Sequence, residues 1–95
     1  MPERRKLTEA EIAAALKDLP GWSLREGKLH RELKFDDFVG AFSFMTGGAL
    51  VAESLNHHPE WSNVYNRVTI DLSTHSEGGV TALDVEWAKR VGALV

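Results

Sequence analysis

The chain has 95 residues, which is enough for one domain but too few for two hydrophobic cores. Hydrophobic residues make up 43% and charged residues 26%, a balance typical of soluble globular proteins and not of disordered or fibrous ones. The net charge of −3 argues against a nucleic-acid-binding face, and the absence of cysteine excludes disulfides, thiolate metal sites and cysteine nucleophiles.

Residues 1–95 are therefore expected to form a single domain. No apolar run approaches the roughly 18 residues of a membrane span, and no hydrophobic signal segment follows the N-terminus. We therefore expect a cytoplasmic protein that does not enter a membrane. A core this small stabilises a domain by only about a few kcal/mol, which favours a homodimer or homotetramer.

The first predicted helix is marked at both ends. Thr8 and Glu11 have the spacing of a capping box, and Leu7 with Ile12 has the spacing of a hydrophobic staple. Pro20 ends the helix because proline cannot continue it and disfavours helix in the residue before it.

A β-hairpin is predicted next. Residues 22–25 and 29–35 have the character of strands, and Glu26 with Gly27 supplies the turn between them. Arg31 falls on the face of the second strand that should pack on the core. Such an arginine reaches either an edge of the sheet or a ligand.

A long second helix is predicted over residues 38–56, with Asp36 or Asp37 as its N-cap. It has more apolar residues than one face needs, which suits burial between two layers or between subunits. Gly47 and Gly48 lie in its middle, and each costs a helix about 1 kcal/mol relative to alanine. Close approach of another helix, either of this chain or of a second subunit, would explain the pair; the alternative is that both are merely tolerated.

The last part of the chain combines strand and helix patterns. Residues 64–73 alternate apolar and polar side chains, Gly78 and Gly79 form a turn, and Thr81 with Asp84 caps a final helix. The residues alone thus predict an α+β domain in which helices cover one face of a sheet.

Three of the four histidines gather in one segment of the sequence: His57, His58 and His75. Histidine gives and takes protons near neutral pH because its unperturbed pKa is about 6.5. His57 and His58 lie where the second helix must end, since Pro59 follows them. Two adjacent titratable rings favour a chemical role over simple helix capping.

A longer motif surrounds these histidines. It runs Asn56-His57-His58-Pro59-Glu60-Trp61-Ser62-Asn63-Val64-Tyr65-Asn66, then Ser73-Thr74-His75, with Glu53 before it and Asp84 after it. This pattern resembles the pterin-4a-carbinolamine dehydratases, and a weaker similarity covers nearly the whole chain. Asn56 departs from the pattern, because some members of that family carry a charged aspartate there.

The resemblance implies a four-stranded antiparallel sheet with three helices on one face, in the order α-β-β-α-β-β-α. Strand geometry also favours two strands, not one, between residues 64 and 75. One straight strand, rising about 3.3 Å per residue, would separate His75 from His58 by more than about 30 Å. A turn near Asn66 and Arg67 would return His75 to the end of the second helix, and it would give Tyr65 a structural role.

The resemblance also implies a reaction. Family members remove water from a 4a-hydroxytetrahydropterin, giving a quinonoid dihydropterin during tetrahydropterin recycling, with no metal and no cofactor. On this basis the catalytic residues are expected to be His57, His58 and His75. The residues expected to contact substrate are Glu53, Asn56, His57, His58, Trp61, Ser73, Thr74 and His75.

Three of the individual roles stay open. Glu53 lies one helical turn before His57 and either orients that imidazole or is an ordinary exposed glutamate. Trp61 either stacks on the pterin or belongs to the core. Asp84 has a sufficient structural reason at the start of the last helix and is expected to be mostly structural.

Other functions compete with cofactor-free dehydration. A metal site could use the three histidines, Asp84 and the spare His30, but adjacent histidines diverge by about 100° on a helix. Animal members of the family also dimerise a homeodomain transcription factor through the second helix, so a coactivator-type module is an alternative. A further alternative is another hydrated pterin, connected with molybdenum-cofactor metabolism. We expect any self-association to use the second helix and a sheet edge.

Overall fold

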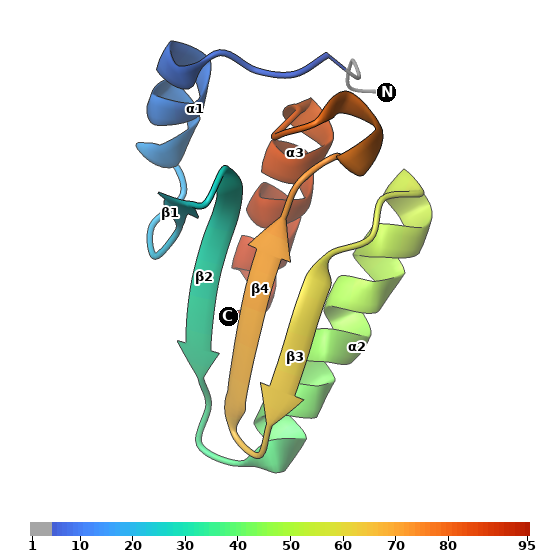
Figure 1. The fold of residues 1–95 in the computed structure, drawn as a ribbon. Helices are drawn as coiled ribbons and strands as arrows, with labels where there is room; N and C mark the ends of the chain where they lie inside the picture. Colours follow the sequence, from blue (N-terminus) through green and yellow to red (C-terminus); the bar gives the residue numbers. More distant parts are fainter. Residues whose placement is uncertain (1–4) are drawn as a thin grey trace.

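The computed structural model describes residues 5–95; residues 1–4, which the predicted domain includes, lie outside the described residues. The sheet forms one layer, and α2 and α3 lie side by side behind it (Figure 1). The elements are α1 (Glu9–Leu16), β1 (Ser23–Arg25), β2 (Lys28–Lys34), α2 (Phe38–Leu55), β3 (Glu60–Val64), β4 (Arg67–Leu72) and α3 (Ala82–Val91), with short 3₁₀ helices η1 (His75–Glu77) and η2 (Gly92–Leu94).

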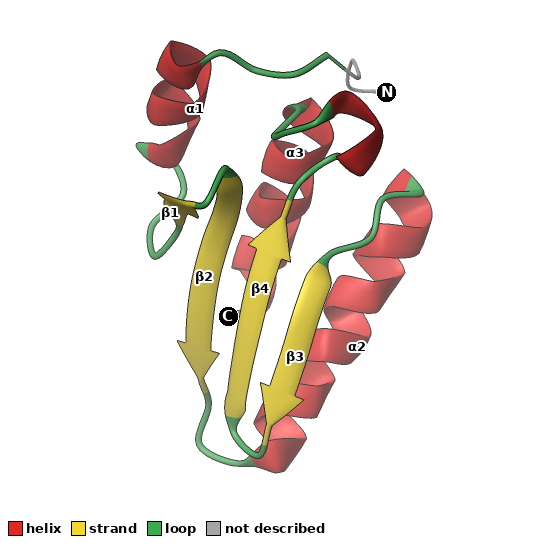
Figure 2. Ribbon diagram, in the orientation of Figure 1, coloured by secondary structure: helices red, strands yellow, loops and turns green. Residues whose placement is uncertain are grey.

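The sheet is antiparallel throughout, with strand order β1-β2-β4-β3 (Figure 2). Leu29 pairs with Leu72, and Leu33 pairs with Val68, so apolar residues of the two central strands share the helix-covered face. The other face carries the alternate, polar residues of β2 and β4, and no helix within residues 5–95 covers it (Figure 2). The predicted α+β class, four strands and element order are confirmed.

Both hairpin turns use left-handed backbone. Glu26 and Gly27 have φ values of 51° and 77°, which confirms the first predicted turn. The second turn was predicted at Asn66 and Arg67, but it lies one residue earlier, and Tyr65 takes the left-handed conformation with a φ of 50°. The Nδ2 of Asn63 donates to the carbonyl of Tyr65 in the turn and to that of Arg67 just after it, and these bonds hold the turn closed.

The predicted helix starts are present as side-chain caps. Thr8 and Glu11 form a complete capping box on α1, and Asp37, one of two predicted candidates, accepts from Gly40 N–H to cap α2. Asn56 ends α2 in the left-handed conformation with a φ of 49°, which an asparagine adopts more readily than most residues. The chain can therefore leave the helix at once toward β3.

The two central glycines of α2 make room for side chains of the same chain. A Cβ on Gly48 would lie 3.0 Å from the ring of Trp61 and 3.1 Å from the ring of Trp87. A Cβ on Gly47 would lie 2.7 Å from Leu94. The expected close approach of another helix is thus that of α3, through Trp87, and the described structure needs no second subunit to explain the pair.

The outward side of α2 is apolar. Its exposed hydrophobic residues are Phe38, Val39, Phe42 and Leu50, while its inner side packs into the core through Ala41, Phe44, Gly48, Ala52 and Leu55. With 18 residues and a mean hydropathy of 1.4, α2 is long and apolar enough to span a membrane by length and composition alone. The expectation that no apolar segment approaches the length of a membrane span is therefore corrected. Length and composition alone do not make α2 a membrane helix, because a core helix of a soluble protein meets the same two criteria.

Two side chains left open by the sequence have clear surroundings. Arg31 lies on the helix-covered face of β2, and its side chain packs against Gly21. A Cβ added to Gly21 would lie 2.8 Å from the Nε of Arg31. His30 lies on the open face, where Nδ1 contacts Asp71 at 2.8 Å and Nε2 contacts Glu32 at 2.9 Å. The Glu32 and Asp71 carboxylates raise the pKa of His30 above its usual value, against smaller opposing effects of burial and Arg25.

Candidate functional site

The predicted histidines lie at one end of the molecule. The helix α2 and the strand β4 run in the same direction and end at the same edge of the fold, the top of Figure 1. His57 and His58 follow the Asn56 cap of α2, and His75 opens η1 three residues after the last residue of β4. The hairpin of β3 and β4 thus returns the chain to the end of α2, as the sequence argument required.

His57 is nearly buried and is held by a carboxylate. Its Nε2 lies 2.5 Å from Oδ1 of Asp84, whose side chain is 0% exposed, while the His57 side chain is 10% exposed. Its Nδ1 has no hydrogen-bond partner in the described part of the chain. Since no buried side-chain nitrogen or oxygen of residues 5–95 lacks a partner, Nδ1 reaches the surface.

Asp84 is in turn surrounded by donors. Its Oδ2 accepts from the Thr74 hydroxyl at 2.9 Å and from the Thr81 N–H at 2.8 Å. Asp84 therefore has the capping role that we predicted, but this role is incomplete, because the same carboxylate also contacts His57. The spacing of the motif was the only sign of this role in the sequence.

His58 pairs with Glu53 instead. Its Nε2 lies 2.5 Å from Oε2 of Glu53, and the two side chains are 57% and 75% exposed. Orientation of His57 by Glu53 is one of the two predicted roles, and it is wrong: the Glu53 carboxylate contacts His58, whereas His57 contacts Asp84 of α3. The contribution of so exposed a pair to stability is small.

The remaining predicted residues divide into exposed and packed ones. Asn56 and His75 are exposed, and His75 and Ser73 border a surface hollow of about 260 Å³ that neither His57 nor His58 lines. Trp61 packs edge-on against Trp87 with ring centroids 5.9 Å apart. Of its two predicted roles, stacking on the pterin or packing in the core, these contacts favour packing in the core. The Thr74 hydroxyl is buried and already hydrogen-bonded to Asp84 and Thr81.

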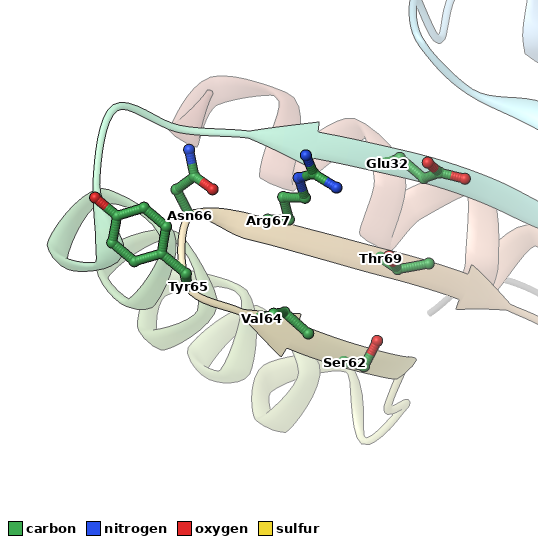
Figure 3. A pocket seen from close by; sticks show the side chains of 7 residues that line it. All are labelled: Glu32, Ser62, Val64, Tyr65, Asn66, Arg67 and Thr69. Carbon is green, nitrogen blue, oxygen red and sulfur yellow. The ribbon is translucent and has the colours of Figure 1, made fainter.

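A larger hollow lies at the opposite end of β3 and β4. It measures about 470 Å³ and opens on the uncovered face of the sheet beside the Tyr65 turn (Figure 3). Its lining residues are Glu32, Ser62, Val64, Tyr65, Asn66, Arg67 and Thr69. None of the predicted catalytic residues borders it, and it contains no histidine.

Metal coordination gains no support from the geometry. Within residues 5–95, no three histidine, aspartate or glutamate side chains are arranged so that they could hold a metal ion. The His57 nitrogen nearest a carboxylate is already hydrogen-bonded to Asp84. What the arrangement can do is hold imidazoles for proton transfer at the surface beside the end of α2.

Comparison with known proteins adds independent information. A family model described as pterin 4 alpha carbinolamine dehydratase matches residues 5–94. A protein of Solibacter usitatus (strain Ellin6076), named by provisional assignment as a pterin-4-alpha-carbinolamine dehydratase, is 58% identical over 89 residues, covering 94% of each chain. A Brucella ovis protein with the same provisional name is 50% identical over 93 residues, covering 96% of each chain.

The fold has a similar solved structure. A crystal structure from Brucella melitensis, described as a transcriptional coactivator/pterin dehydratase, superposes with a TM-score of 0.91 at 50% identity. The match covers 95% of this chain and 98% of the other. The similarity therefore extends over all the elements that carry the histidines.

Proposed function

Because this chain belongs to the pterin-4-alpha-carbinolamine dehydratase family, we propose that it removes water from a 4a-hydroxytetrahydropterin. In this reaction the bond between C4a and the hydroxyl oxygen breaks, and the oxygen leaves as water after gaining a proton from an acid. A base takes the proton from N5, and the N5 electron pair forms the double bond to C4a. The product is the quinonoid dihydropterin.

The observation that carries the proposal is the set of imidazoles at one end of the fold. His57 is hydrogen-bonded to buried Asp84, His58 to Glu53, and His75 opens η1 at the same end of the fold. Imidazoles suit both proton transfers because they exist in both protonation states near neutral pH. We assign the acid–base chemistry to these three residues, without a metal or redox cofactor.

Substrate contacts are proposed for the residues around the histidines. Exposed Asn56 and partly exposed Ser73 offer hydrogen-bonding groups to the edge of a pterin ring. Trp61 is partly exposed and can form one wall despite its core packing, and Glu53 acts through His58. The side chain of Thr74 serves the site indirectly, because Asp84 and Thr81 occupy its hydroxyl.

A second role in assembly is supported by α2. Its exposed apolar residues would be poorly placed in a monomer, and the similar Brucella melitensis protein is described as a coactivator as well as a dehydratase. We propose a cytoplasmic homodimer or homotetramer that associates through α2 and a sheet edge. A coactivator-type partner on the same helix is the alternative use of that surface.

Catalysis is tested by generating the 4a-hydroxytetrahydropterin in situ and following its dehydration by stopped-flow ultraviolet absorbance. The parent protein should accelerate dehydration, and His58→Ala or His75→Ala should remove about 10²-fold or more of that acceleration, the usual scale of general acid–base catalysis. The control is His30→Gln on the open sheet face, which should keep the parental rate. If both site variants are as fast as the parent, the assignment is wrong.

A further inference from the structure

A buried chain of hydrogen bonds connects the start of α3 with His57. The Oγ1 atoms of Thr81 and Thr74 are 2.7 Å apart, and Thr74 Oγ1 donates to Asp84 Oδ2 at 2.9 Å. The three residues are at most 3% exposed. We call Thr81, Thr74 and Asp84 the threonine relay.

The direction of each bond in the relay follows from the number of protons available. A hydroxyl has one proton, and the Thr74 proton goes to the Asp84 carboxylate. The proton between the two threonines must then come from Thr81, whose oxygen accepts from Leu83 N–H at 3.3 Å. Oδ2 of Asp84 thus has two donors, the Thr74 hydroxyl and the Thr81 N–H.

This arrangement fixes the proton on His57. A carboxylate only accepts hydrogen bonds, so the short contact between Asp84 Oδ1 and His57 requires the ring proton to be on Nε2. Nδ1 then carries the free lone pair, and it is the ring nitrogen without a partner in the described residues.

We propose that Thr81 and Thr74 are positioning residues for His57: they hold Asp84, which keeps His57 in the Nε2–H form, so that Nδ1 exchanges the proton with the pterin. The last step rests on the proposed function, whereas the tautomer does not. A capping role explains the contact between Thr81 and Asp84. It does not explain why Thr74, which lies beyond the end of β4, places a buried hydroxyl between them.

The substitution Asp84→Asn gives the sharpest test. The two donors at the Oδ2 position require an oxygen, so the new amide should turn its NH₂ group toward Nε2 of His57. Nε2 must then accept, and the neutral ring should change to the Nδ1–H form. The same substitution in the serine protease triad leaves the geometry intact and lowers kcat about 10⁴-fold through the wrong tautomer.

The tautomer is measured by nuclear magnetic resonance of ¹⁵N-labelled histidine above pH 8, where imidazole is neutral. The expected result is Nε2–H at His57 in the parent and Nδ1–H in Asp84→Asn. An unchanged tautomer in the variant, or Nδ1–H in the parent, overturns the proposal. If the tautomers are as expected but the parent does not dehydrate the pterin, the proposed function fails and the tautomer assignment stands.

A matched set of threonine variants tests the relay without changing Asp84. Thr81→Val should lower kcat about tenfold with little change in KM, and Thr81→Ser should restore it because serine keeps the hydroxyl. The control Thr8→Val removes the equivalent cap from α1, far from His57, and should leave kcat unchanged. If Thr81→Val and Thr8→Val have equal kcat well below their melting temperatures, Thr81 is only a cap and the proposal is wrong.

Discussion

The two adjacent glycines of α2 should respond oppositely to alanine. Alanine gains about 1 kcal/mol over glycine in a helix interior. At Gly47 the new methyl would meet Leu94 Cδ1 at 2.7 Å, but Leu94 is 44% exposed and near the end of the chain, so its side chain can move away. Gly47→Ala should therefore raise the free energy of unfolding by up to about 1 kcal/mol.

At Gly48 the same gain is opposed by two fixed rings. The methyl would lie 3.0 Å from Trp61 and 3.1 Å from Trp87, which is 0% exposed and donates its indole N–H to the Gly48 carbonyl at 3.2 Å. Overpacking of this kind costs about 1–3 kcal/mol. The net effect of Gly48→Ala should be a loss of about 1 kcal/mol.

Thermal unfolding followed by circular dichroism measures both variants. For a domain of this size, 1 kcal/mol corresponds to about 4–8 °C in Tm, so the two variants should differ by roughly 10 °C. Both must be compared at one protein concentration, because self-association also raises Tm. Equal Tm values would refute the reasoning from ring contacts, and a loss of stability in Gly47→Ala that shrinks on dilution would place a partner helix against Gly47.

Three further predictions concern the sheet, the core and α2. Because Glu32 and Asp71 raise the pKa of His30, the stability that His30 contributes should be complete below its unfolded pKa of about 6.5 and decline as pH rises through the folded pKa. His30→Gln should therefore lower the urea midpoint more at pH 5.5 than at pH 9, and an equal loss at both values would contradict the ion-pair interpretation. Trp87→Phe should cost about 2 kcal/mol or more in chemical denaturation, because it opens a cavity in the core and removes the indole N–H that donates to the Gly48 carbonyl. A loss below 0.5 kcal/mol, within the range of ordinary surface substitutions, would contradict this packing. Leu50→Lys, at a residue 68% exposed, should reduce the oligomer mass in light scattering while leaving secondary structure intact, and an unchanged mass would exclude this part of α2 from the interface.

Local signals were sufficient for most of the fold. The capping box of Thr8 and Glu11 and the Glu26-Gly27 turn depend on residues within a few positions of one another, and the structure confirms both. The second turn was misplaced because the sequence favours asparagine for left-handed backbone. The structure instead uses Tyr65, which the amide of Asn63 holds in place.

The details of the site depended on contacts that a sequence does not contain. The spacing from Glu53 to His57 suggested a pair, but the chain leaves α2 at Asn56, and this change of direction brings Glu53 to His58 instead. The partner of His57 is Asp84, 27 residues away, and only the position of α3 beside α2 brings them together. Long-range packing decides such pairs, whereas the motif indicated only which residue types take part.

The central claim is that the imidazoles of His57, His58 and His75 surround one pterin. The most direct test adds a stable dihydropterin to ¹⁵N-histidine-labelled protein and follows the four imidazole side chains by nuclear magnetic resonance. The account predicts saturable shifts for those three rings with one common dissociation constant, and no shift for His30 on the open face. Binding that shifts His30, or that leaves any one of the three unchanged at saturation, would contradict it.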